Sequence, residues 1–267
     1  MAARLLAVFA ATATVLAQPV PLPNTFDYYV QLGSPDSQVK LDVFVDLLCP
    51  VRHHLSQSGA CRLSPALRPP TMRPPSAAPR LQDCASEWST LLQLSAHYKP
   101  SQLALRFHLF PLPYHTWAFS AAYAANVIAS LNSTAQLAWM NYMFSGGQLQ
   151  FYNDATAGMN ASAVFGLLAT TAAAQTGVSA AAVLAGLQDG NLNEATRISW
   201  KYACSRSVTG TPAFFLNELP LFDQGDGFSL AQWTALIDPL FAGADGADAP
   251  RCEKQLSGFV AKHTAAC

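Results

Sequence analysis

The stretch Val39-Lys-Leu-Asp-Val-Phe-Val-Asp-Leu-Leu-Cys-Pro50 carries the pattern that decides the fold. From Val39 to Val45, aliphatic residues occupy every second position and alternate with a lysine, an aspartate and a phenylalanine. This period of two predicts a β-strand with one clearly buried face. Because the strand runs directly into Cys49-Pro50, it places a cysteine at its carboxyl end.

Immediately after this cysteine the composition of the chain changes. The segment from Val51 to Gln82 contains five Arg, six Pro and two His, but no Asp, Glu, Lys or aromatic residue. Because Arg68-Pro-Pro-Thr-Met-Arg-Pro-Pro75 has neither helical nor strand periodicity, we expect residues 51–82 to be a disordered or extended insertion. A structureless loop of this length inside a compact domain requires a special explanation.

The residues on either side of the insertion suggest an explanation for its length and composition. Without residues 51–82, Cys49-Pro50 joins Asp83-Cys84 and spells Cys-Pro-Asp-Cys at a strand-to-helix boundary. A Val51 codon begins with GT and the Gln82 codon can be CAG, which are the edges of a spliceosomal intron lying between codons. We therefore hypothesise a retained intron, with a genuine surface loop as the alternative. Sequencing of the mRNA across this junction distinguishes the two, and finding only inserted reads in deep coverage would defeat the intron.

The rest of the chain alternates between strand and helix patterns. The predicted elements are strands over 26–32, 39–45, 103–109 and 213–216, with a partner strand from Leu219, and helices over 83–98, 117–131, 134–144, 161–175, 179–187, 192–205 and 230–241. Ser229 is the expected N-cap of the last helix. The order predicts an α/β domain over about 26–241, with an all-helical insertion over about 116–205 and a C-terminal tail over 242–267.

Two distant segments together resemble the DsbA-like branch of the thioredoxin superfamily. They are the joined Cys-Pro-Asp-Cys and Val208-Thr-Gly-Thr-Pro-Ala-Phe-Phe215. In that branch a cis proline faces the C-x-x-C pair, and a helical domain is inserted between the third strand and the cis-proline strand. Phe110–Phe119 also resembles the segment that enters the helical insertion in lumenal relatives. The resemblance covers residues 26–241 without the insertion at 51–82, and it implies a thioredoxin-like fold with an inserted all-helical subdomain.

The joined motif predicts thiol-disulfide chemistry. The first turn of a helix presents unpaired amides and partial positive charge, which stabilise a thiolate. Cys49 would attack a substrate disulfide and Cys84, about one turn on, would resolve the mixed disulfide. Pro50 falls in the first turn, where proline is tolerated. Because the Asp83 carboxylate disfavours a second negative charge, we expect a less acidic nucleophile and a more reducing pair than with histidine there.

The resemblance also implies roles for residues outside the motif. Thr211-Pro212 would lie against the cysteines, where a proline without an N–H lets neighbouring backbone pair with a bound peptide and keeps metal from bridging the thiols. A trans proline that merely begins a strand is the alternative. Val43 occupies the position where many thioredoxins carry a buried acid, so proton-transfer aid from that position is not expected.

The insertion should weaken this chemistry. With residues 51–82 present, Cys49 is far from Cys84 in the chain and loses its covalent place on the helix. A disulfide remains possible because loop closure costs only about 0.6 kcal/mol per doubling of length. Precise cycling is less favoured, since small misplacements of reacting groups cost rate heavily, and Cys61 could compete. We expect this form to be weak or inactive, and the form that lacks 51–82 to be active.

Several features indicate the secretory pathway, with the ER lumen or the cell exterior as destination. Residues 1–17 combine one positive charge, an apolar run and small residues at the end, which predicts a cleaved signal peptide. Gln18-Pro-Val-Pro-Leu-Pro23 cannot continue a helix, which disfavours a buried N-terminal helix. Asn132-Ser-Thr134 and Asn160-Ala-Ser162 are sequons for N-glycosylation.

Six cysteines allow 15 full pairings and the sequence does not choose among them; a Cys204–Cys252 bridge is one guess.

Composition limits the partners. The chain is 51% apolar and 12% charged, enough for a sizeable core, and its net charge of -1 gives no electrostatic basis for binding nucleic acid or anionic membrane. After the signal peptide no stretch reaches the roughly 20 apolar residues of a membrane span. We expect protein or peptide thiols and disulfides as partners, no cofactor and no metal, since no second C-x-x-C or His pair at ligand spacing accompanies the cysteines. These patterns leave the oligomeric state open.

Other interpretations stay open. Cys49 and Cys84 could form a purely structural disulfide, or the chain could be a redox-inactive thioredoxin-like module that binds proteins in the ER lumen or outside the cell. A Cys49→Ser variant separates that module from an enzyme. A glutathione-dependent transferase or isomerase of the same broad fold usually keeps a single Ser or Cys, so the restored pair argues against it. We expect His108 to be a surface strand residue and His115 a loop residue rather than acid/base groups.

Overall fold

The computed structural model describes residues 29–49, 84–221 and 225–242. A five-stranded sheet with the order β1-β3-β2-β4-β5 lies at its centre, and β2 and β3 are parallel while the other neighbours are antiparallel. The strands are β1 (Tyr29–Leu32), β2 (Val39–Val45), β3 (Leu103–Leu109), β4 (Ala213–Leu216) and β5 (Leu219–Pro220). The helices are α1 (Cys84–His97), α2 (Ala118–Leu131), α3 (Ala135–Phe144), η3 (Gly147–Phe151), α4 (Ala161–Thr176), α5 (Ala180–Gly186), α6 (Gly190–Ser205), α7 (Leu230–Ile237) and α8 (Pro239–Ala242).

Some sequence predictions concern residues outside the described ranges and stay predictions. They are the signal peptide (1–17), residues 26–28 of the first strand, Pro50, Asp83, the insertion (51–82), Cys61, Cys252, Cys267 and the tail from 243 onward.

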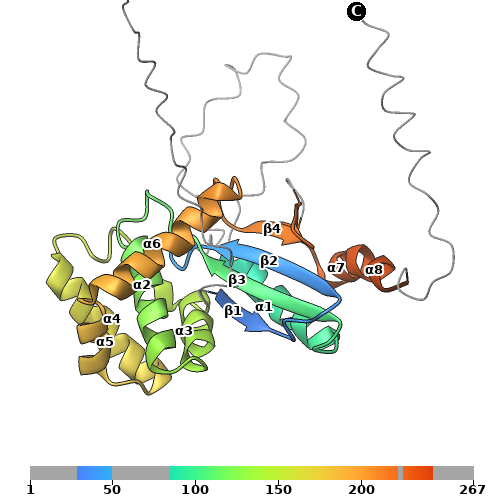
Figure 1. Cartoon of the computed structure of the whole chain (residues 1–267). Coiled ribbons are helices and arrows are strands. Elements are labelled where there is room, and N and C mark those ends of the chain that lie inside the picture. The colour runs from blue at the N-terminus through green and yellow to red at the C-terminus, as the bar shows by residue number, and fades with distance from the viewer. Residues whose placement is uncertain (1–28, 50–83, 222–224, 243–267) are drawn as a thin grey trace, which may run out of the picture.

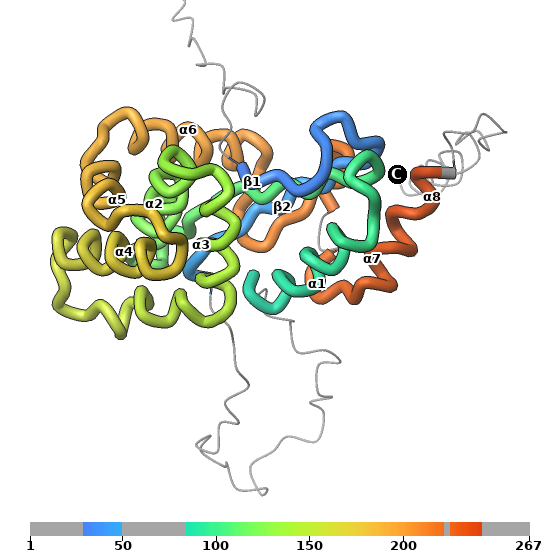
Figure 2. The backbone as a smooth tube through the Cα atoms, turned by 90° about the horizontal axis from the view of Figure 1, so that it is seen from below, coloured from blue at the N-terminus to red at the C-terminus, as the bar shows by residue number. Residues whose placement is uncertain are grey.

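The helices divide into two groups around the sheet (Figure 1). Helices α2 to α6, which lie between β3 and β4 in the chain, gather at one end of the molecule, whereas α7 and α8 lie at the other end. In the second view, α1 and α7 run next to each other along one face of the sheet, and α6 lies on the opposite side (Figure 2). No helix among the described residues is long and apolar enough to cross a bilayer.

Both faces of the central strand β2 are covered, so the prediction of a single buried face was wrong. Every residue from Leu41 to Val45 is buried. Leu41, Val43 and Val45 belong to the core shared with α1, while Phe44 packs with Tyr202 of α6 in a second core. The alternation in sequence therefore separates two packed layers rather than a core from solvent.

A buried polar cluster lies under this second layer, between β2 and β3. Asp42 Oδ1 is 2.8 Å from Nε2 of His108 and 3.4 Å from a guanidinium nitrogen of Arg106. The His108 ring stacks on Phe44 at 4.7 Å. His108 is only 3% exposed, so its expected place on the surface was wrong: the helices inserted after β3 return over this face.

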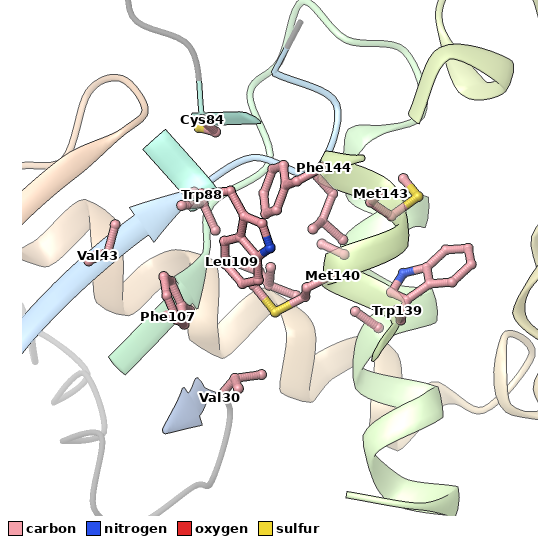
Figure 3. Packing of buried hydrophobic residues seen from close by; sticks show 14 of the residues in the cluster. Val30, Val43, Cys84, Trp88, Phe107, Leu109, Trp139, Met140, Met143 and Phe144 are labelled. Carbon is pink, nitrogen blue, oxygen red and sulfur yellow. The ribbon is translucent and has the colours of Figure 1, made fainter. Parts of the chain in front are cut away.

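The interface between the sheet and α1 is aromatic (Figure 3). The ring of Trp88 in α1 lies 4.6 Å from Phe107 of β3 and 4.9 Å from Phe144 of α3. Its indole N–H donates to Oδ1 of Asn141 at 2.7 Å, so the polar edge of the buried ring is satisfied. Trp88 thereby joins the helix that carries Cys84 to both the sheet and the helical block.

Local capping explains where several helices begin. Asn160 and Ser179 cap α4 and α5, and Ser229 forms a capping box with Gln232 at α7, as predicted for that residue. Asp189 caps α6, whose first residue is therefore Gly190, earlier than expected. The predicted last helix is interrupted: α7 ends at Ile237 and the short α8 begins with Pro239.

Candidate active site

A tight turn after β2 presents Cys49. The backbone N–H of Cys49 donates to the carbonyl of Asp46 at 3.0 Å, and the N–H of Leu48 donates to the Asp46 carboxylate at 2.9 Å. Both bonds fold the chain back at the carboxyl end of the strand. Cys49 is consequently held just beyond the carboxyl end of β2, and only 3% of its surface is exposed.

Helix α1 begins at Cys84, against Cys49. The backbone N–H of Cys84 donates to the Cys49 sulfur at 3.4 Å, and both residues are present as thiols. An amide at a helix start is one of the donors that no carbonyl within the helix can satisfy, and here a sulfur accepts it. Although the insertion interrupts the covalent link that the joined motif would have, the described residues keep Cys49 against the start of the helix. Whether cycling is slower stays a prediction.

The two thiols occupy different environments. Cys84 is 1% exposed, and its pKa is raised well above the ordinary thiol value by burial, by a hydrogen bond to Cys49 and by charge on Cys49. Contacts with Thr211 and with the backbone of Asp46 act in the opposite direction. Burial disfavours the thiolate because charge is costly in a low dielectric. Cys84 is thus a protonated, inward-facing thiol, whereas Cys49 accepts the helix amide.

The loop before β4 closes the site from the opposite side. The peptide bond between Thr211 and Pro212 is cis, as the resemblance implies. The Cys49 thiol donates to the Thr211 carbonyl at 3.9 Å, and both loop residues are buried. Because β4 pairs with β2, the loop before β4 and the turn after β2 meet at the same sheet edge. Cys49 and Thr211, which are 162 positions apart in the chain, are therefore in contact.

Three neighbouring residues were not expected in the site. Asp46 and Tyr114 were not singled out from the sequence, and His115 was expected to be a loop residue without an acid/base role. The Asp46 carboxylate lies 2.6 Å from Nδ1 of His115. The pKa of Tyr114 is raised by partial desolvation and by charge on Cys49, Asp46 and Cys84. The signal that could have pointed to Asp46 is an acidic residue inside an otherwise apolar run, shortly before the cysteine.

The remaining predicted positions lie away from the cysteine pair. Asn132 and Asn160 are both exposed, one at the end of α2 and the other as the cap of α4. Cys204 is an exposed thiol in α6. In the described part of the chain, no group of three or more His, Cys, Asp or Glu side chains could hold a metal ion.

Comparison with solved structures places this geometry in a known fold. A candidate protein-disulfide isomerase from Pseudomonas syringae superposes with a TM-score of 0.57 at 17% identity, over 78% of this chain and 96% of that one. α-DsbA1 from Wolbachia pipientis gives 0.55 at 18% identity, over 84% and 94%. BdbD from Bacillus subtilis gives 0.53 at 11%, over 81% and 94%.

The chain has a DsbA-like thioredoxin fold. The prediction of an α/β thioredoxin-like fold with an inserted helical subdomain is confirmed. No protein-family model and no curated protein matches the sequence. In this DsbA-like fold the turn after β2, the start of α1 and the loop before β4 converge on the two sulfurs.

Proposed function

We propose that this chain is a thiol-disulfide oxidoreductase of the secretory pathway that acts on protein disulfides through Cys49 and Cys84. The observation that carries the proposal is the 3.4 Å hydrogen bond from the first amide of α1 to the Cys49 sulfur, opposite Thr211-Pro212. A donated N–H favours the thiolate over the thiol, because it stabilises the charged form. Cys49 is therefore the nucleophile and Cys84 the resolving thiol.

The reaction follows from this asymmetry. The Cys49 thiolate attacks one sulfur of a substrate disulfide, forms a mixed disulfide and releases the first substrate thiolate. Cys84 then loses its proton and attacks the Cys49 sulfur, which forms the Cys49–Cys84 disulfide and releases the second substrate thiolate. Two electrons pass from the cysteine pair to the substrate, and the two substrate thiolates take up protons. The reverse sequence oxidises a substrate dithiol.

Several observations support the substrate class and the compartment. The Pseudomonas syringae neighbour is described as a candidate protein-disulfide isomerase, and a periplasmic thioredoxin-like protein from Salmonella enterica serovar Typhimurium superposes with a TM-score of 0.50 at 15% identity, over 80% of this chain and 91% of that one. The signal-peptide pattern and the two exposed sequons agree with export. We propose that the form with residues 51–82 cycles more slowly, because a long segment rather than two residues connects its nucleophile to α1.

One observation favours a second candidate function, a redox-inactive protein-binding module. Both cysteines are almost fully buried, at 3% and 1% exposure, and a substrate disulfide must reach Cys49 in line with the attacking sulfur. In such a module the groove beside Pro212 would bind a partner chain without exchange. The two functions differ in whether a covalent intermediate forms.

Peptide mapping by mass spectrometry separates them. The reduced protein is mixed with a disulfide-bonded peptide and quenched with acid. The oxidoreductase predicts a Cys49–Cys84 disulfide in the unmodified chain, a trapped peptide adduct on Cys49 in Cys84→Ser, and no adduct at this site in Cys49→Ser. Cys204→Ser, which changes an exposed thiol of α6, is the matched control and should behave as the unmodified chain. Peptide binding without any adduct on Cys49 would establish the module instead.

A further inference from the structure

Asp46 is a buried carboxylate whose partners determine the state of a neighbouring imidazole. Its Oδ1 accepts the N–H of Leu48 at 2.9 Å. Its Oδ2 accepts the N–H of Leu112 at 3.1 Å and lies 2.6 Å from Nδ1 of His115. Since two backbone donors already point at it, the carboxylate is the acceptor and Nδ1 carries the proton. In the neutral ring, Nε2 of His115 is then left as a proton acceptor.

This pair lies next to the two thiols. The carbonyl of Asp46 accepts the N–H of Cys49 at 3.0 Å, and the Asp46 backbone also contacts the thiol of Cys84. Tyr114, the residue before His115, is close enough for charge on either cysteine to raise its pKa. The loop from β3 to α2 therefore holds the imidazole against Asp46, the residue whose backbone contacts both cysteines.

The imidazole also has a route to solvent. His115 lines an open hollow of about 280 Å³ together with Leu48, Tyr152, Asn153 and Asp154. Its side chain is 17% exposed, whereas that of Asp46 is fully buried. A proton taken up at Nε2 can leave through this hollow, and a proton can return by the same route.

The resolving step needs such a group. Cys84 must become a thiolate before it can attack the mixed disulfide, yet burial opposes that ionisation. Val43, which lies in the same buried core as both cysteines, has no titratable group. Asp42 and His108 face the other layer of the sheet, where Phe44 and Tyr202 enclose them. Within the described ranges, His115 is the histidine that adjoins the turn bearing Cys49.

We propose that His115, oriented by Asp46, accepts the proton of the Cys84 thiol during the resolving step. This inference rests on the proposed function. The proton moves from the Cys84 sulfur to Nε2 of His115. The thiolate attacks Cys49, the Cys49–Cys84 bond forms, and the bond from Cys49 to the substrate breaks. The departing substrate thiolate takes its proton from His115, or takes one from solvent while His115 releases its own proton to solvent, so the imidazole ends neutral. Asp46 is a positioning residue.

Rapid-quench mapping with oxidised glutathione tests the step on the full chain. The reaction is stopped with acid, and mass spectrometry follows the Cys49–glutathione adduct and the Cys49–Cys84 disulfide separately. His115→Asn keeps an amide near the position of Nδ1 and removes Nε2. We expect the adduct to form at an unchanged rate and to decay about 100-fold more slowly, the lower range for general acid–base catalysis. An unchanged decay rate would overturn the proposal.

A further measurement excludes a merely structural effect. In His115→Ala, added imidazole should restore fast decay in proportion to its concentration; no rescue would contradict a proton-transfer role. The charged and titratable groups around His115 are Asp46, Asp154, Arg197 and Tyr114, and they are unchanged in both variants.

A matched control comes from the other histidine–carboxylate pair. His108→Gln retains a donor near Asp42 but lies on the opposite layer of the sheet, and it should leave adduct decay unchanged. Slowing by both variants alike would indicate a general effect on packing and would overturn the proposal.

Different results would contradict the proposed function and the proton-transfer role of His115. If the unmodified chain never forms the Cys49 adduct, the proposed function fails; if it forms and resolves the adduct equally well without His115, only this inference fails.

Discussion

The Glu87 carboxylate, in the first turn of α1, accepts a 2.7 Å hydrogen bond from the backbone N–H of Gly227, 140 positions further along the chain. Glu87 is buried, about one turn after Cys84. The bond ties the start of the helix that carries the resolving thiol to the segment just before α7. The position of Cys84 against Cys49 therefore depends on the C-terminal part of the domain as well as on the sheet.

Removal of this carboxylate should destabilise the fold. In Glu87→Ala, the N–H of Gly227 loses a charged acceptor, and we expect the free energy of unfolding to fall by about 1–3 kcal/mol. Glu194→Ala is the control, because Glu194 pairs with Lys201 at 3.3 Å with both side chains more than half exposed. Exposed pairs of this kind contribute less than about 1 kcal/mol. Urea unfolding of the two variants measures the difference. An equal loss in the free energy of unfolding would contradict a stabilising role for the hydrogen bond between Glu87 and Gly227.

The two active-site thiols should react with alkylating agents in a fixed order. The pKa of Cys84 is raised by burial and by its neighbour, whereas Cys49 accepts a helix amide. Since each pKa unit changes the thiolate fraction tenfold, iodoacetamide at neutral pH should modify Cys49 at least roughly ten times faster than Cys84. Peptide mapping of the time course checks this, and faster modification of Cys84 would reverse the assigned roles.

The same shift has a consequence for stability. A thiol whose pKa is higher in the folded chain than in the unfolded chain contributes stability that is fully present below the unfolded value. That contribution is lost as pH rises through the folded value, so stability should decline above the ordinary thiol pKa of 9.0. Cys84→Ala should flatten this alkaline decline in urea unfolding measured on both sides of that pH, whereas Cys204→Ala, at an exposed position, should alter it less. A decline of undiminished slope in Cys84→Ala would contradict the buried environment of this thiol.

The form without residues 51–82 should be the faster reductase of insulin disulfides. In that form the turn after Cys49 leads covalently into α1, so less freedom is lost when the reacting sulfurs align. A third form, in which a Gly/Ser linker of equal length replaces the insertion, separates the effect of length from that of composition. Equal insulin turnover by all three forms would show that the interruption has no catalytic cost.

Both sequons should be used when the chain is expressed through a eukaryotic secretory pathway. Asn132 and Asn160 are exposed at helix ends, where a glycan can project into solvent. Asn132→Gln and Asn160→Gln should each remove one glycan, seen as a stepwise gain in mobility that deglycosylation abolishes. Identical mobility of both variants and the unmodified chain would argue against passage through the ER.

Much of the fold follows from local pattern. The strands at 39–45, 103–109 and 213–216 appear with the predicted bounds, and α1 ends at His97, one residue before its predicted end. Their periodicity reports how each segment meets its nearest layer. The pattern did not show that α6 returns over β2 and β3, so His108 was expected at the surface although it is buried.

The sequence by itself determined the order of the elements and the identity of the two sulfurs, because alternation, capping and a C-x-x-C interrupted by a segment of foreign composition are all visible along the chain. Only the tertiary structure decided which polar groups accompany those sulfurs. Asp46 meets His115 across 69 positions and Glu87 meets Gly227 across 140. Contacts of this range depend on how layers stack, and no period within a single segment encodes that stacking.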